Sequence, residues 1–210
     1  MIVFLLAASA FAGWIDAVIG GGGLVLIPVL MSATSMPAAS VLATNKVAAI
    51  SGTASAAATL VRRVGVPRAT WVYAFIAGVM AALGARAVSL IDDSVATPII
   101  LVLLIGVGVF VALNPKFGQE GAGIFSGKRL GLAALAVALI GGYDGVFGPG
   151  TGMFLIMAFT AVFTQGFVRS AAMAKVVNTA TNLGALLVFG LGGFINWKLA
   201  LALAAANVAG

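Results

Sequence analysis

The stretch YDGVFGPGTG, from Tyr143 to Gly152, places one carboxylate and five helix-breaking residues between two long apolar segments. Pro149 cannot continue a helix, and the glycines permit backbone conformations that other residues avoid. A helix that breaks inside hydrocarbon leaves N–H and C=O groups unpaired, so such a break persists only where it is buried in protein or lines a wet cavity. We therefore expect this stretch, and the similar IGGGGL at Ile19–Leu24, to face an internal site.

The composition indicates an all-α integral membrane protein. Of the 210 residues, 62% are hydrophobic and only 8% are charged, with a mean hydropathy of +1.21. Five segments approach the ~20 residues that a helix needs to cross ~30 Å of hydrocarbon. They are Met1–Ile15, Ala69–Ala85, Val95–Leu113, Leu130–Gly142 and Leu183–Ile195, the last of which needs its upstream polar turns to span.

Two parts of the chain match each other in one register. Asp16 and Gly20 recur 128 residues later, as Asp144 and Gly148. After one extra residue within the second glycine-rich stretch, Lys46 recurs as Lys175 at a separation of 129. Matched Asp, Lys and Gly positions are harder to obtain by chance than matched Ala or Leu, so the sequence predicts two tandem helical repeats with broken or re-entrant helices.

The predicted repeats occupy residues 1–113 and 130–210, and a hydrophilic linker occupies residues 114–129. If each glycine hairpin is re-entrant, the repeats are parallel; if its short arm completes a crossing, they are inverted. The loop after the first repeat's long polar helix carries Arg62, Arg63 and Arg68, whereas its counterpart near Gly192–Lys198 carries one cation. By the positive-inside rule this difference favours opposite sides of the membrane, and hence inverted repeats.

Ionisable and amide side chains within the apolar segments predict an anion site. A charge at the bilayer centre costs at least ~2.5–3.5 kcal/mol, so such groups normally face a cavity or one another. Spacings of three, four and seven put Lys175, Asn178, Thr179 and Asn182 on one helix face. The short helix after each break presents unpaired N–H groups and the positive end of its dipole, which also favours an anion. The predicted substrate-binding residues are Gly22, Gly23, Asn45, Lys46, Thr151, Gly152, Lys175, Asn178 and Asn182.

The aspartates Asp16 and Asp144 are predicted to couple or gate transport. A carboxylate beside a helix break and an anion site can change its protonation as substrate and partner come and go. The alternative interpretation is purely structural: Asp–Lys salt bridges that fix helix packing, with the glycines allowing close approach of helices. Both interpretations can hold, because a gating salt bridge can also be structural.

The residue inventory excludes several kinds of chemistry. With neither cysteine nor histidine, the sequence offers no disulfide, thiolate nucleophile, or His or Cys metal ligand, and no cofactor or metal site is predicted. The net charge of +6 resides mostly in short loops, which argues against a nucleic-acid partner. An intramembrane Ser–Lys hydrolase is a remote alternative, because Ser51 and Ser170 each lie five residues from a lysine and off the i+4 face.

Four stretches of the sequence resemble the repeated signatures of the TauE/SafE, or TSUP, family of membrane transporters. They are GWIDAVIGGGGLVLIPVL (Gly13–Leu30), ATNKVAAISGTASA (Ala43–Ala56), GGYDGVFGPGTGMFL (Gly141–Leu155) and AMAKVVNTATNLGALLVF (Ala172–Phe189). The resemblance implies a permease of duplicated helical fold in the bacterial or archaeal cytoplasmic membrane, with the lipid bilayer and a small sulfur-containing or organic anion as partners. It also implies a further turn and helix after Gly210, so the second repeat is expected to lack its last helix.

The predicted function is therefore secondary transport of a small anion such as sulfite, a sulfonate or thiosulfate, with export and proton coupling as expectations. A passive anion channel that uses the same basic site is the main alternative. No enzymatic activity is expected. The sequence favours no particular substrate within this class and no particular oligomeric state.

Overall fold

The structure, a computed structural model, describes residues 1–113 and 124–210, and every regular element in these ranges is a helix. Most of the predicted linker lies outside the described residues. The helices are α1 (Ile2–Ile19), α2 (Gly23–Ala33), α3 (Ala38–Val64), α4 (Ala69–Val88), α5 (Asp93–Leu113), α6 (Gly127–Val146), α7 (Thr151–Phe163), α8 (Phe167–Leu191) and α9 (Trp197–Ala209).

Four of these helices, α1, α4, α6 and α8, are long and apolar enough to cross a membrane. The apolar segment at 183–195 forms the end of α8 together with the polar turns before it, as expected. Helix α6 begins at Gly127, inside the predicted hydrophilic linker, and α8 begins at Phe167.

The short helices α2 and α7 follow the two glycine-rich breaks. They contain 11 and 13 residues. At a rise of 1.5 Å per residue these helices are only about 16 and 20 Å long, well short of the ~30 Å hydrocarbon core. Each doubles back beside the helix before it: the end of α2 lines one cavity with the start of α1, and the N–H of Ile124, just before α6, donates to the Phe163 carbonyl at the end of α7.

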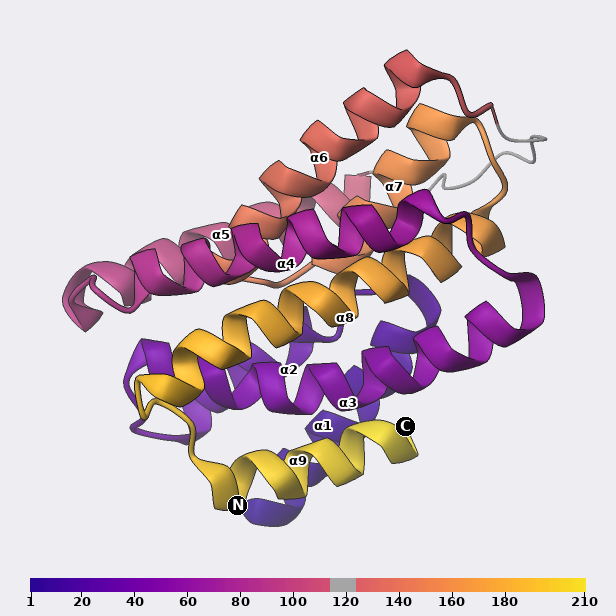
Figure 1. The fold of residues 1–210 in the computed structure, drawn as a ribbon. Helices are drawn as coiled ribbons and strands as arrows, with labels where there is room; N and C mark the ends of the chain where they lie inside the picture. The colour runs from indigo at the N-terminus through magenta and orange to yellow at the C-terminus, as the bar shows by residue number, and fades with distance from the viewer. Residues whose placement is uncertain (114–123) are drawn as a thin grey trace.

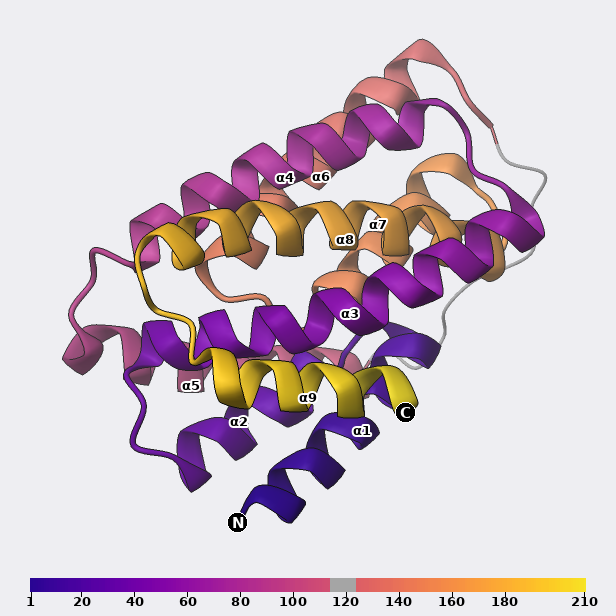
Figure 2. The same ribbon diagram turned by 60° about the horizontal axis from the view of Figure 1, so that its bottom comes forward.

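The long helices α3 and α8 pack together at the centre of the molecule and run in opposite directions (Figure 1). Helix α4 covers α8 and also packs on α6, while α9 covers α3 and also packs on α1 (Figure 2). Helices α4 and α9 also run in opposite directions (Figure 1). This arrangement interleaves the first and second parts of the chain, and the opposed directions are those that inverted repeats require. The repeat itself stays a prediction.

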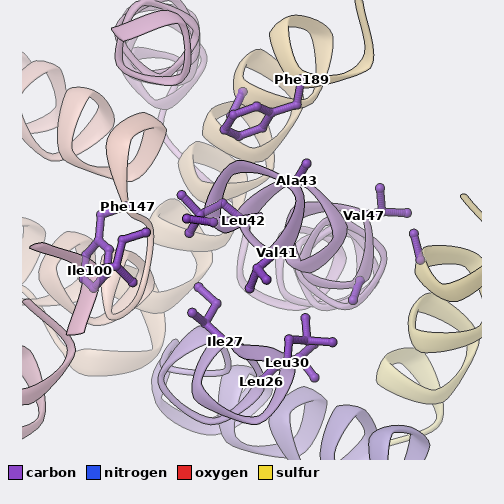
Figure 3. Packing of buried hydrophobic residues seen from close by; sticks show 14 of the residues in the cluster. Leu26, Ile27, Leu30, Val41, Leu42, Ala43, Val47, Ile100, Phe147 and Phe189 are labelled. Atoms are coloured by element: carbon purple, nitrogen blue, oxygen red, sulfur yellow. The ribbon is translucent and has the colours of Figure 1, made fainter. Parts of the chain in front are cut away.

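A large apolar cluster joins α2 to α3. Leu26, Ile27 and Leu30 of α2 point toward Val41 and Leu42 of α3 (Figure 3). Phe147, which follows α6, is almost fully buried in the same cluster and lies beside Ile100 of α5 (Figure 3). The second glycine-rich break is thus anchored in the apolar core built by the first part of the chain.

The two ends of the bundle differ in charge. Helix α3 ends where α4, α6 and α8 begin (Figure 1). Hydrogen bonds tie this end together: Tyr73 of α4 donates to the carbonyl of Leu130 on α6 at 3.2 Å, and Arg129 donates to the carbonyl of Val162 on α7 at 2.9 Å. We call it the cationic end, because no carboxylate lies there among the described residues. Its cations are Arg62, Arg63, Arg68, Lys128, Arg129 and Arg169. The opposite end carries Arg86, Asp92, Asp93 and Lys198.

Candidate functional site

The two glycine-rich breaks, which were expected to face an internal site, touch each other. We call Gly20–Gly22 the first glycine loop and Phe147–Gly150 the second glycine loop. A Cβ atom built on Gly20 would lie 2.7 Å from the carbonyl carbon of Gly152, and one built on Gly152 would lie 2.7 Å from the Gly20 oxygen. Only glycine permits this approach of backbone to backbone, so the glycines bring the starts of α2 and α7 to one place.

Backbone conformation and three hydrogen bonds shape the loops. Gly20 ends α1 with φ of 80°, and its N–H bonds to the Asp16 carbonyl at 2.9 Å. In the second loop, Gly148 and Gly150 also have positive φ, 99° and 81°. The Tyr143 hydroxyl donates to the Pro149 carbonyl at 2.6 Å, and the Thr151 hydroxyl donates to the Gly148 carbonyl at 2.7 Å. These bonds brace the break from its two flanking helices.

Two buried ion pairs link the first part of the chain to the second. Lys46 on α3 donates to the carboxylate of Asp144 on α6 at 2.6 Å. Lys175 on α8 donates to the carboxylate of Asp16 on α1 at 2.9 Å, and also to the Asp16 main-chain carbonyl. These are the ion pairs of the described residues. Each lysine therefore pairs with the aspartate of the other predicted repeat.

A cavity of about 20 Å³ lies between the loops and these pairs. That volume is about enough for one water molecule. Its lining residues are Asp16, Gly20, Gly23, Asn45, Lys46, Ala49, Asp144, Gly148, Gly150, Gly152, Asn178 and Asn182. Carboxylates of the protein thus pair with both lysine ammonium groups, and the cavity has no room for an oxyanion.

Most of the predicted site residues line this cavity, and three do not. Gly22 packs against α1, where a Cβ would lie 2.6 Å from the Ala12 carbonyl oxygen. The Thr151 hydroxyl donates to the Gly148 carbonyl of the second glycine loop, and the Lys175 ammonium group donates to Asp16, which itself lines the cavity. All three support the residues around the cavity without lining it in this state.

Four lining residues were missing from the predicted set: Gly20, Ala49, Gly148 and Gly150. Ala49 lies three residues after Lys46 and four after Asn45, so the helix-face rule would have found it. The three glycines belong to stretches that the sequence had singled out, but only the folded loops show which glycine faces the cavity.

Thr179 was expected on the polar face of α8, and this was wrong. Its hydroxyl donates to the Lys175 carbonyl at 2.7 Å, and it lines a separate groove with Trp71. Thr179 follows Asn178 directly, so it lies about 100° further around the helix. The spacing of four from Lys175 is compatible with a position on the cavity side of α8 and with a position on the groove side.

The groups around the cavity have the chemistry of an anion site. Lys46 uses one of its three donors on Asp144, and the amides of Asn45, Asn178 and Asn182 border the cavity. Asn182 donates to the Thr53 hydroxyl at 3.3 Å, joining α8 to α3 between positions 129 apart, the register of the predicted repeat. The cavity also adjoins the starts of α2 and α7, where the helix dipoles favour negative charge.

Comparisons with known proteins agree with one another. The sequence profile of a family described as "Sulfite exporter TauE/SafE" matches residues 5–210. A "Probable membrane transporter protein" of Haemophilus influenzae is 33% identical over all of this chain and 82% of its own length. The "Probable membrane transporter protein YfcA" of Escherichia coli K12 is 36% identical over 92% of this chain and 71% of its own length. No solved structure shows significant similarity to this chain.

Proposed function

This chain belongs to the TauE/SafE family of membrane transporters, and on that basis we propose that it is a secondary transporter for a small sulfur-containing or organic anion in the cytoplasmic membrane. Sulfite is the first candidate substrate, because the family description names it. The observation that carries the proposal is the pair of buried lysines held by carboxylates beside the touching glycine loops.

The Lys46–Asp144 pair supports a competition mechanism. A substrate oxyanion and the Asp144 carboxylate present the same charge-assisted acceptors to the Lys46 ammonium group. When the helices separate and the cavity grows, the substrate replaces Asp144 on Lys46, and the amides of Asn45 and Asn178 supply directional donors. When the substrate leaves, Asp144 returns, so the lysine is not left buried without a counter-ion. Such a cycle keeps the Lys46 ammonium group paired in both states.

Transport into proteoliposomes tests the proposal. We expect Lys46→Met to reduce uptake of radiolabelled sulfite at least tenfold, because it removes the charge and keeps the length of the side chain. Lys198→Met is the matched control: Lys198 is exposed near the start of α9, and its loss should leave uptake unchanged. Thiosulfate, sulfonates and carboxylates assayed in the same way define the substrate class. Normal sulfite, thiosulfate, sulfonate and carboxylate uptake by Lys46→Met would overturn the proposed site.

Folding has to be separated from function in this test. Removing one partner of a buried ion pair costs about 3–5 kcal/mol, because the other charge is left uncompensated. The double variant Lys46→Met/Asp144→Asn removes both charges, so we expect it to regain most of the thermal stability that Lys46→Met loses. It should still fail to transport, since no ammonium group remains at this position. Transport by the stable double variant would assign the pair a packing role only.

We further propose that Asp144 couples transport to protons. Asp144→Asn keeps the shape of the side chain and fixes its charge at zero. In proteoliposomes it should abolish net transport driven by a pH gradient while counterflow exchange of the anion continues. Net transport with unchanged pH dependence would place coupling elsewhere.

The passive-channel alternative makes a different prediction. A channel equilibrates its anion, whereas a coupled transporter accumulates it above the outside concentration. We expect accumulation under an imposed pH gradient and its collapse when the gradient is dissipated. Equilibration without accumulation under every imposed gradient would favour the channel.

A further inference from the structure

An apolar groove runs along the surface of α4 and α8, away from the site described above. It has a volume of about 430 Å³ and extends on α4 from Trp71 to Ala82 and on α8 from Val176 to Leu187. The eleven helical rises between the first and last of these residues correspond to about 16 Å, which matches half of the ~30 Å hydrocarbon core, the depth of one lipid leaflet.

The groove adjoins a cation, Arg62, toward the cationic end of the bundle. A second cavity of about 290 Å³ shares Trp71, Val176 and Thr179 with the groove and is also lined by Arg62 of α3. The Arg62 side chain is exposed and has no carboxylate partner among the described residues. Arg62 belongs to the cationic end, which the positive-inside rule assigns to the cytoplasmic leaflet, where anionic lipids lie.

We propose that this groove is a binding site for a diacyl anionic phospholipid of the cytoplasmic leaflet. The phosphate pairs with the Arg62 guanidinium, whose planar donors suit a phosphate oxyanion. One acyl chain lies along the groove between Trp71 and Leu187. The groove contacts Val176 and Thr179, immediately after Lys175 in α8, so the bound lipid packs against the helix that carries one of the two buried ion pairs.

The test uses the full chain purified in mild detergent and native mass spectrometry with added lipids. We expect the protein to bind phosphatidylglycerol about fivefold more tightly than phosphatidylcholine with the same acyl chains, the effect of one interfacial cation. Arg62→Gln should abolish this preference, and Arg62→Lys should retain most of it. Arg63→Gln is the matched control, because Arg63 is the neighbouring cation and lies outside both cavities; it should keep the preference.

A second pair of variants tests the acyl chain. Ala82→Phe fills the groove and should weaken binding of both lipids alike, whereas Leu83→Phe, at the exposed neighbouring position, should leave both unchanged. Equal loss of preference in Arg62→Gln and Arg63→Gln would reduce the effect to diffuse surface charge and overturn the site. A homodimer that Ala82→Phe dissociates would overturn it too, because a second copy would then occupy the groove.

Discussion

At the scale of single residues, the two ion pairs differ although their positions in the predicted repeats correspond. The Asp144 side chain is 2% exposed and its carboxylate accepts from Lys46, whose side chain has no second hydrogen bond among the described residues. Asp16 is 11% exposed, and its main-chain carbonyl accepts from Lys175 in addition to its carboxylate. Lys175 would therefore keep an acceptor if the Asp16 carboxylate were removed, and Lys46 would lose the one it has.

This asymmetry predicts unequal effects of two matched substitutions. Asp144→Asn should approach the ~3–5 kcal/mol cost of leaving a buried charge unpaired, whereas Asp16→Asn should cost roughly half as much. Thermal unfolding in detergent measures the difference. Equal destabilisation would mean that the main-chain carbonyl contributes little to holding Lys175.

At the scale of elements, glycine positions decide whether α2 and α7 can meet. The two glycine loops and the helices that follow them approach within backbone contact at Gly20 and Gly152. Gly20 also has a left-handed backbone, whereas Gly21 has no atom of another residue nearer than 3.6 Å to a built Cβ. Gly20 is therefore required by its backbone conformation and by its close contact, whereas the adjacent Gly21 is required by neither.

Alanine substitutions expose this difference. Gly20→Ala should destabilise the protein by about 1–2 kcal/mol through the left-handed backbone and by about 1–3 kcal/mol through overlap with Gly152. Gly21→Ala, the matched control, should change stability by less than about 0.5 kcal/mol. Unfolding midpoints of the two variants give the comparison. A Gly20→Ala protein as stable as Gly21→Ala would show that the loops do not touch in the native state.

At the scale of the whole molecule, charge distinguishes one end of the helix bundle from the other. The cationic end gathers six Arg or Lys side chains without a described carboxylate, while the opposite end mixes both signs. The positive-inside rule therefore predicts that the turns after α3 and before α6 face the cytoplasm. The turn between α4 and α5 then faces outward.

Cysteine labelling of this chain checks the orientation without a background, because its 210 residues contain no cysteine. Ser126, at the start of α6, and Ser94, in the first turn of α5, are both exposed. In intact cells, a membrane-impermeant maleimide should label Ser94→Cys and spare Ser126→Cys. Inside-out vesicles should give the reverse. The opposite labelling pattern would reverse the assigned orientation. The lipid groove would then lie in the outer leaflet, not in the cytoplasmic one.

Much of this architecture could be predicted from local sequence, and the pairing of distant residues could not. Hydropathy and glycine clusters located the breaks and indicated that both face an internal site, whereas the structure supplies the specific contact between Gly20 and Gly152. Which lysine meets which aspartate depends on how α3 and α8 cross, and no local pattern encodes that crossing. The small volume of the cavity was also beyond sequence reasoning, because it depends on the sum of many packing distances.

The crossed ion pairs bear on the biogenesis of the protein. Helix α3 has 27 residues, yet it is not among the helices apolar enough to span a membrane, and it carries the buried Lys46 in its first half. The partner of Lys46 is Asp144, which the ribosome synthesises 98 residues later. During translation, the first part of the chain thus contains Lys46 and Asp16 before their native ion-pair partners have been synthesised. Neither part therefore reaches its final charge pairing until α6 and α8 have joined α1 and α3.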